Sequence, residues 1–125
     1  DKQLKMLFKD MQKEANKGNY VIAGGDFNKD LLGNSDQVFN KGKATKDSWA
    51  KPIKKKIIPK GFHLVEPENQ IPSCRNANQK YAKSSNTYLL DGFIVCDTIT
   101  VNKSEVLDTK FKYSDHNPVY LDFKG

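Results

Sequence analysis

The stretch Tyr20-Val21-Ile22-Ala23-Gly24-Gly25-Asp26-Phe27-Asn28 is an apolar run that ends in two glycines, an acid and an amide. The apolar run predicts a strand over residues 20–24, buried on both faces because its hydrophobic character is nearly continuous. In an extended backbone, side chains two residues apart point the same way, so Asp26 and Asn28 are expected on one face and Phe27 on the other. An ordinary strand followed by an Asp/Asn turn gives the same letters, and both interpretations are open at this point.

The composition suits one small domain. The chain has 125 residues, of which 37% are hydrophobic and 29% are charged, and this length is typical of one domain with a single core. No apolar run approaches the roughly 20 residues that a membrane span needs. The net charge is +6, and every basic residue except Arg75 is a lysine. This balance favours anionic partners, although a solvated lysine-rich surface gives the same composition.

The cysteine and histidine content limits the chemistry. Two cysteines, Cys74 and Cys96, are too few for a disulfide framework. Cys96 follows an apolar run and is expected to be a small buried residue in a strand. His63 and His116 are the only histidines in the sequence, and no spacing typical of structural zinc occurs. The sequence therefore predicts no transition-metal cage.

Hydrophobic spacing predicts a helix before the first strand. Apolar residues follow the i, i+3, i+4, i+7 rule and predict an amphipathic helix over residues 2–16, which Gly18 is expected to end. A helix followed at once by a strand is typical of layered α/β (α+β) folds, in which helices cover a sheet. The chain is therefore expected to be α/β (α+β).

The middle of the chain has no regular period. Residues 31–34 are expected to form one helical turn. Residues 41–60 hold eight lysines and a single acid, Asp47, with Trp49 among them. An aromatic side chain beside lysines can stack on a base or sugar. A lone Trp can equally anchor a loop to the core, and both interpretations stay open.

The second half of the chain contains more strands. Asp91 lies among apolar neighbours, so its carboxylate is expected to need a partner. Arg75 lies in a polar loop over residues 67–83 and is a candidate for two-pronged phosphate binding, although a surface role fits it too. The pattern predicts strands at residues 62–65, 86–96, 98–106 (beside the preceding one) and 119–123.

A histidine follows an acid shortly before the last strand, in Ser114-Asp115-His116-Asn117-Pro118. Pro118 is expected to help to hold this loop. A histidine beside a carboxylate suits proton transfer, because the imidazole pKa lies near neutrality. A turn with a capped imidazole gives the same letters. Three polar clusters thus lie beside predicted strands: Asp26 with Asn28, Asp91, and Asp115 with His116.

Three segments occur in this order: Gly25-Asp26-Phe27-Asn28, Leu90-Asp91-Gly92-Phe93-Ile94-Val95 and Ser114-Asp115-His116-Asn117-Pro118-Val119. They resemble the Gly-Asp-(Phe/Leu)-Asn, Asp-x-(Phe/Ile) and Ser-Asp-His-x-Pro-Val motifs of the endonuclease/exonuclease/phosphatase superfamily. This superfamily comprises metal-dependent phosphoesterases related to deoxyribonuclease I. The spacing of the segments agrees with the family as well.

The resemblance implies metal-dependent phosphoester hydrolysis, in which the parent protein is a nuclease, another phosphodiesterase or a phosphatase. It implies that Asp26 orients or deprotonates the attacking water and that Asn28 donates a hydrogen bond to the phosphoryl transition state. It also implies that His116 contacts the phosphate and is held by Asp91. Asp115 is implied as a ligand of a divalent metal, for which magnesium is the natural ion and manganese a substitute.

The resemblance covers nearly all 125 residues but only the C-terminal half of the family's domain. It implies a two-sheet α/β sandwich like that of deoxyribonuclease I, with about one of the two sheets in this chain. The expected inner face is apolar and available to the N-terminal half or to self-association. Because the family's N-terminal half supplies a metal-binding Glu, the isolated chain is expected to be inactive. A non-catalytic module that binds nucleic acid or another polyanion is the alternative function.

Overall fold

Strand β5 is the centre of the fold, with an antiparallel neighbour on each side. The computed structural model describes residues 2–40, 50–76 and 85–125. The described chain mixes helix and strand in three small antiparallel sheets, with strand orders β1-β5-β2, β3-β4 and β6-β7. Its elements in chain order are α1 (Lys2–Asn16), β1 (Ile22–Asp26), α2 (Ser35–Phe39), η1 (Lys55–Ile57), β2 (Phe62–Val65), β3 (Cys74–Arg75), β4 (Thr87–Tyr88), β5 (Asp91–Cys96), β6 (Thr100–Val106) and β7 (Val119–Lys124).

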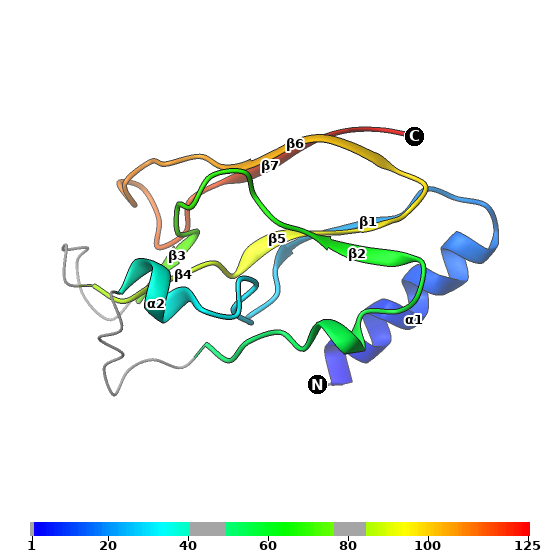
Figure 1. Ribbon diagram of the computed structural model, residues 1–125, viewed down its shortest axis with the longest axis horizontal. Helices are drawn as coiled ribbons and strands as arrows, with labels where there is room; N and C mark the ends of the chain where they lie inside the picture. Colours follow the sequence, from blue (N-terminus) through cyan, green and yellow to red (C-terminus); the bar gives the residue numbers. More distant parts are fainter. Residues whose placement is uncertain (1, 41–49, 77–84) are drawn as a thin grey trace.

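The three-stranded sheet lies between two other layers. Figure 1 shows α1 on one side of this sheet and the β6–β7 ribbon on the other. Successive side chains of a strand point to opposite faces, and on β5 both Ile94 and Val95 are 0% exposed. Full burial of such a side chain stabilises the fold by about 1.5–3 kcal/mol. The core therefore lies on both faces of β5, and the expected α+β class is confirmed.

The helix predicted over residues 2–16 is confirmed as α1. Leu4, Phe8 and Met11 are its buried residues, and they pack against the three-stranded sheet. The helix ends as predicted at Gly18, whose φ of +86° is a conformation that glycine adopts at little cost. The strand predicted over residues 62–65 is confirmed as β2.

Strand β1 differs from the prediction in position and in burial. It begins at Ile22, two residues later than predicted, and Tyr20 is 62% exposed. The predicted burial on both faces is wrong, because β1 is an edge strand and its last three residues are exposed. Gly24 is needed for packing rather than for a turn: a Cβ there would lie 2.7 Å from the Phe93 ring.

Two predictions about the other strands are wrong. The strand predicted over residues 86–96 is interrupted at Leu89 and Leu90, whose amides donate to serine hydroxyls instead of continuing a ladder. The strand predicted over residues 98–106 is β6, but it pairs with β7 and not with β5. The described chain therefore contains a sheet covered by a second β layer, not a single sheet with an exposed inner face.

A buried acid shapes the segment that was expected to be a helical turn at residues 31–34. Asp30 accepts hydrogen bonds from three backbone amides and from the Ser35 hydroxyl, which hold the chain in a bend before α2.

The two interpretations of Trp49 concern a residue within 41–49, a segment that lies outside the described ranges. None of the helices in the described ranges has the length and apolar character to cross a membrane.

The central position of β5 is testable by a matched pair of isoleucine substitutions. Ile94→Ala removes a fully buried side chain and is expected to lower the free energy of unfolding by about 2–5 kcal/mol. Ile57→Ala removes an exposed side chain and is expected to change it by less than about 0.5 kcal/mol. Urea denaturation followed by circular dichroism measures both. Equal losses in the two variants would contradict this packing.

Candidate active site

The register of two strands brings Asp26 and Asp91 together. Asp26 is the last residue of β1, Asp91 is the first residue of β5, and the two are direct cross-strand partners. Side chains of such partners lie on the same face, with Cβ atoms about 4.5–5.5 Å apart. The apolar residues that fix the β1–β5 register therefore also place these two carboxylates side by side.

His116 lies between the two carboxylates. It comes just before β7 and forms a β-bridge with Cys74 of β3. Its Nδ1 is 2.8 Å from Asp91 Oδ2, and its Nε2 is 3.7 Å from Asp26 Oδ2. The Asp91 side chain is 12% exposed, whereas those of His116 and Asp26 are 32% and 35% exposed. One ligand atom from each residue lies within 4.8 Å of the others. Solvent therefore reaches this three-residue cluster from the Asp26 side.

Two buried residues that the sequence analysis did not single out hold the His116 loop in place. Asn117 accepts hydrogen bonds from the amide and hydroxyl of Thr109 and donates one to the Pro72 carbonyl. The Ser73 hydroxyl accepts from the amides of residues 90 and 91, and the Ser73 carbonyl accepts from the Asn117 amide. Small polar residues beside a strand are the only sequence signal, because the partners lie far along the chain.

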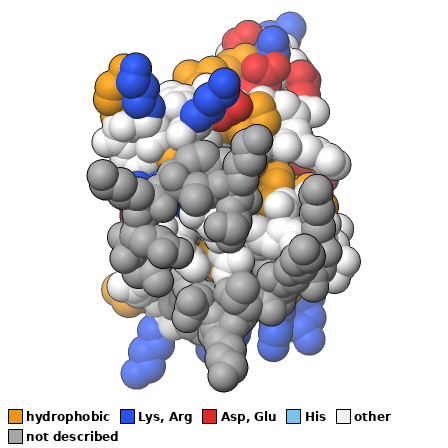
Figure 2. All heavy atoms as spheres, turned by 90° about the vertical axis from the view of Figure 1, so that its left-hand side faces the viewer, with side chains coloured by type: hydrophobic (Ala, Val, Ile, Leu, Met, Phe, Trp, Pro, Cys, Tyr) orange, Lys and Arg blue, Asp and Glu red, His pale blue; other side chains and the backbone are white. Residues whose placement is uncertain are grey.

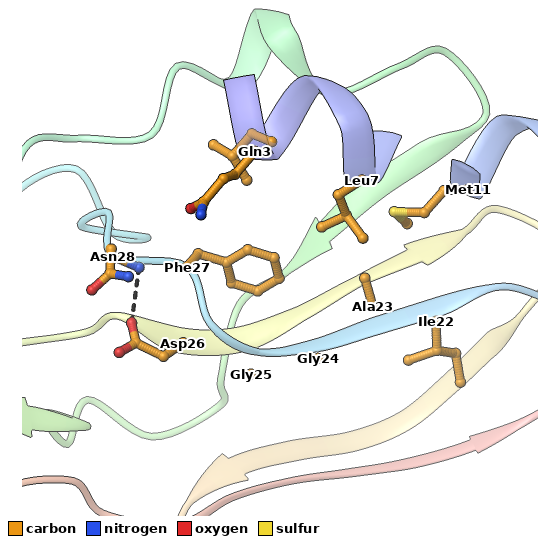
Figure 3. A pocket seen from close by; sticks show the side chains of 11 residues that line it. Gln3, Leu7, Met11, Ile22, Ala23, Gly24, Gly25, Asp26, Phe27 and Asn28 are labelled. Atoms are coloured by element: carbon orange, nitrogen blue, oxygen red, sulfur yellow. Dashed lines mark hydrogen bonds between the residues drawn. The ribbon is translucent and has the colours of Figure 1, made fainter. Parts of the chain in front are cut away.

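Asn28 does not follow the alternation predicted for an extended backbone. Its φ is +53°, in the left-handed region that asparagine adopts more readily than most residues. Its backbone amide donates to Asp26 Oδ1 at 2.8 Å, a bond that Figure 3 shows, with Phe27 turned toward α1. The predicted opposition of Phe27 and Asp26 is seen. The prediction that Asp26 and Asn28 lie on one face of an extended strand is wrong, because the chain makes an Asp/Asn turn there.

Asp115 and Arg75 lie next to the cluster without joining it. The Arg75 amide donates to the Asp115 carbonyl at 2.9 Å. The Asp115 carboxylate accepts a hydrogen bond from the Ser114 hydroxyl and is not part of the group of ligand atoms within 4.8 Å. Arg75 follows Cys74 on β3, so its side chain points to the other face, and its Nη1 donates to the Asn76 carbonyl.

Burial raises one pKa in the cluster, and neighbouring charge raises another. Burial raises the pKa of Asp91, and the hydrogen bonds to His116 and Ser73 offset only part of this effect. Partial burial acts to lower the pKa of His116, but the bond to Asp91 and the negative charges of Asp26 and Asp115 outweigh it, so this pKa is raised. The imidazole thus keeps its proton to a higher pH than a free histidine does.

Cys74 is a neighbour of His116 to which the sequence analysis gave no role. Its Sγ lies 3.6 Å from His116 Nε2, and the residue is 4% exposed. Burial, together with the negative charges of the nearby carboxylates, raises the pKa of Cys74 to about 12. The side chain is therefore a thiol at neutral pH and a poor nucleophile. Both cysteines are free, and the predicted burial of Cys96 in a strand is confirmed.

A groove of about 460 Å³ lies between α1 and β1 and ends at Asp26. Figure 3 shows Leu7 and Met11 on its helix side and Ala23 on its strand side. Neither Asp91 nor His116 lines it. The groove and the three-residue cluster therefore share Asp26 but lie on different sides of the strand.

Comparisons with protein-family models, with curated proteins and with solved structures found no match. The functional interpretation of this chain therefore depends on the three sequence motifs and on the geometry of Asp26, Asp91 and His116. The geometry adds one fact to the motifs: residues from three distant segments converge at one solvent-accessible point.

The raised pKa of His116 is testable by NMR titration of its ring protons. The midpoint is expected above the ordinary value near 6.5, because the surrounding carboxylates favour the imidazolium. Asp91→Asn is expected to lower that midpoint. A group with a raised folded pKa stabilises the fold at low pH, so this contribution is expected to disappear as pH rises through the His116 midpoint. A midpoint below 6.5 in the unmodified protein would contradict the described contacts.

Proposed function

We propose that this chain contributes the acid–base residues of a metal-dependent phosphoester hydrolase. The observation that carries the proposal is the position of His116 between Asp91 and Asp26, at 2.8 Å and 3.7 Å. Phosphoryl transfer requires positioned hydrogen-bond donors, a cation near the phosphate oxygens and a group that handles protons. A largely buried carboxylate, an imidazole and a more exposed carboxylate can supply the hydrogen-bond donors and the group that handles protons.

In this proposal His116 acts on the phosphate. Asp91 accepts the hydrogen bond from Nδ1–H, which leaves Nε2 as the atom that faces the substrate. With its raised pKa, the imidazolium donates from Nε2 to a phosphoryl oxygen as negative charge develops there. Asp91 thus positions the ring and stabilises its charge, and His116 makes the contact with the reacting group.

Asp26 and Asn28 act on the other side of the phosphate. The backbone amide of Asn28 occupies Asp26 Oδ1, so Oδ2 is the oxygen left to orient or deprotonate the attacking water. The Asn28 side chain is exposed, and in this proposal it donates to the phosphoryl oxygens. The left-handed turn at Asn28 places both residues at the strand end instead of along it.

Magnesium fits the described donor set in part. This ion is often bound by one or two carboxylates, with water and substrate phosphate as its other ligands. Asp91 Oδ2 is engaged by His116 and Asp26 Oδ1 by the Asn28 amide, whereas Asp115 offers a carboxylate outside the cluster. We propose that Asp115, next to the cluster, holds the ion together with the Glu that the family resemblance implies, which leaves Asp26 Oδ2 for the attacking water. When bound, magnesium neutralises charge on the phosphate oxygens.

Hydrolysis of bis(4-nitrophenyl) phosphate tests the proposal. A protein that combines this chain with the implied N-terminal half is expected to turn over with magnesium or manganese and to stop with chelator. Asp26→Asn and His116→Gln are each expected to lower kcat by about 100-fold or more. The 125-residue chain alone is expected to be inactive, so turnover by this chain would contradict the need for the implied Glu.

His63→Gln is the matched control for His116→Gln. His63 Nδ1 also lies close to a carboxylate, at 2.7 Å from Asp97, but this pair is exposed and separate from the cluster. The control is expected to keep full activity. If His116→Gln and His63→Gln are equally active, the catalytic assignment of His116 is wrong.

A polyanion-binding module is the second candidate, and one observation favours it. Lys2, Lys5, Lys9 and Lys13 recur at helical spacing on the exposed side of α1, and Figure 1 shows the lysine-containing η1 next to this helix. The end of the molecule seen in Figure 2 is different: its described Lys and Arg side chains stand apart at the upper and lower margins. A basic patch is therefore better supported along α1.

Salt-dependent binding of a single-stranded oligonucleotide tests this second candidate. Lys5→Gln combined with Lys9→Gln is expected to weaken binding and to reduce the slope of log K against log salt by about 0.7 for each lost phosphate contact. Lys112→Gln combined with Lys124→Gln removes the same charge elsewhere and is expected to leave the slope unchanged. Identical slopes in the two double variants would exclude the α1 lysines as the binding patch.

A further inference from the structure

Tyr113 is the most exposed of the large hydrophobic side chains in the described ranges, at 82%. It precedes His116 by three residues, so the two Cα atoms lie within about 11 Å of each other. Single exposed apolar side chains are common on protein surfaces. This one, however, stands next to the group that is proposed to contact the phosphate, on a loop that is tied to the candidate site.

A closed loop carries Tyr113 and ends beside His116. Asn117 Oδ1 accepts hydrogen bonds from the amide and the hydroxyl of Thr109, at 3.2 Å and 2.6 Å, which joins the two ends of the loop. Phe111 is 6% exposed and anchors the loop in the protein. The tip of the loop therefore projects into solvent from a base that also holds His116.

The backbone just before Tyr113 has an unusual conformation. Lys110 and Phe111 have φ angles of +56° and +55°, in the left-handed region that is unfavourable for residues with a Cβ. Such residues persist only where the surrounding contacts hold them, and here Asp108 Oδ1 accepts a hydrogen bond from the Lys110 amide at 2.9 Å. The two left-handed residues lead the chain from the buried Phe111 to the exposed Tyr113, so the place of this tyrosine is set by the loop.

Lys112 lies over one side of the Tyr113 ring. Its Nζ is 5.4 Å from the ring centroid, a distance at which cation–π attraction holds the two side chains together. The rest of the ring is open to solvent, as its high exposed fraction shows. A nucleobase is a flat aromatic group that stacks on such a ring whichever base it is. A lipid chain or a sugar phosphate offers no flat aromatic surface for this contact.

We propose that Tyr113 is a stacking platform for a nucleobase, and that the substrate of the candidate site is a nucleotide-containing phosphoester. This inference rests on the proposed hydrolase function and deepens it, because it selects one substrate class. In a single strand each base is joined through its sugar to a phosphate, so a base on Tyr113 keeps a phosphate on the His116 side. Tyr113 thus determines specificity and takes no part in proton transfer.

NMR titration of the 125-residue chain with two matched ligands, in the presence of chelator, tests this proposal. One ligand is a single-stranded pentamer of deoxyadenylate, and the other is an abasic pentamer with the same phosphates. Adenine stacked on Tyr113 is expected to shift the ring resonances of this residue upfield, whereas the abasic pentamer is expected to leave them in place. Both ligands are expected to shift the His116 ring resonances, because both carry the phosphate.

Substitutions at two exposed tyrosines separate stacking from general effects on binding. Tyr113→Ala is expected to weaken binding of the adenylate pentamer by about tenfold and to leave binding of the abasic pentamer unchanged. Tyr113→Phe keeps the ring and is expected to bind within about twofold of the unmodified chain. Tyr20→Ala is the matched control, because Tyr20 is 62% exposed and precedes β1, whereas Asp26 ends that strand. Circular dichroism establishes that the variants are folded.

Several results would overturn the proposal. One is a set of Tyr113 resonances that does not move with the adenylate pentamer, and another is a set of His116 resonances that moves with neither ligand. Equal affinities of Tyr113→Ala and Tyr20→Ala for the adenylate pentamer, or an equal loss toward both pentamers in Tyr113→Ala, would overturn it too.

These readouts need no turnover, so they separate this proposal from the proposed function. If stacking is found as expected and the longer protein fails to hydrolyse bis(4-nitrophenyl) phosphate, the hydrolase function is wrong and Tyr113 is a base-binding residue of a site without catalysis. If hydrolysis is found and the two pentamers bind alike, the hydrolase function stands and the assignment of Tyr113 is wrong.

Discussion

Two carboxylates that face each other on neighbouring strands are the constraint on which the candidate site depends. Asp26 and Asp91 are direct partners in the β1–β5 register, and like charges opposite each other destabilise a sheet. Asp91 is also largely buried, which makes its charge more costly. The protonated imidazole of His116 lies between the two groups and offsets part of both effects. The strand register and the His116 loop therefore stabilise each other.

The position of His116 is a product of tertiary structure. The loop is joined to β3 by the Cys74 bridge and to Ser73 by the Asn117 amide. Ser73 also binds the amides of residues 90 and 91, at the start of β5. One buried serine thus connects the segment that carries His116 with the segment that carries Asp91. An unpaired buried amide costs about 1–3 kcal/mol, so this connection resists movement of either segment.

The sequence predicted the local elements of this fold better than their arrangement. Helix α1 and strand β2 follow from hydrophobic spacing and from Gly18, because both signals act over a few residues. The edge position of β1 could not be predicted from the sequence, since the apolar run of an edge strand under a covering helix resembles that of a strand buried on both faces. The pairing of β6 with β7 depends on a contact between segments that are well separated in the chain.

The residues of the candidate site also fall into two groups, those that the sequence predicted and those that it did not. Asp26, Asp91 and His116 were found because each stands out beside a strand. Ser73, Cys74 and Asn117 were missed, because their roles come from partners 17 to 45 residues away. The sequence did not decide whether the chain turns at Asn28, since an Asp/Asn pair can continue a strand or end it. The structure shows that it ends the strand, with the Asn28 amide on the Asp26 carboxylate.

Cys74 adds a neutral thiol to this charged cluster. Its Sγ lies 3.6 Å from His116 Nε2, and Asp26 Oδ2 lies 3.7 Å from the same nitrogen. Burial and the negative charges of the nearby carboxylates raise the pKa of Cys74 to about 12, so the side chain stays a thiol at neutral pH. The same carboxylates raise the pKa of His116. They therefore favour the positive charge on the imidazole and disfavour a negative charge on the sulfur beside it.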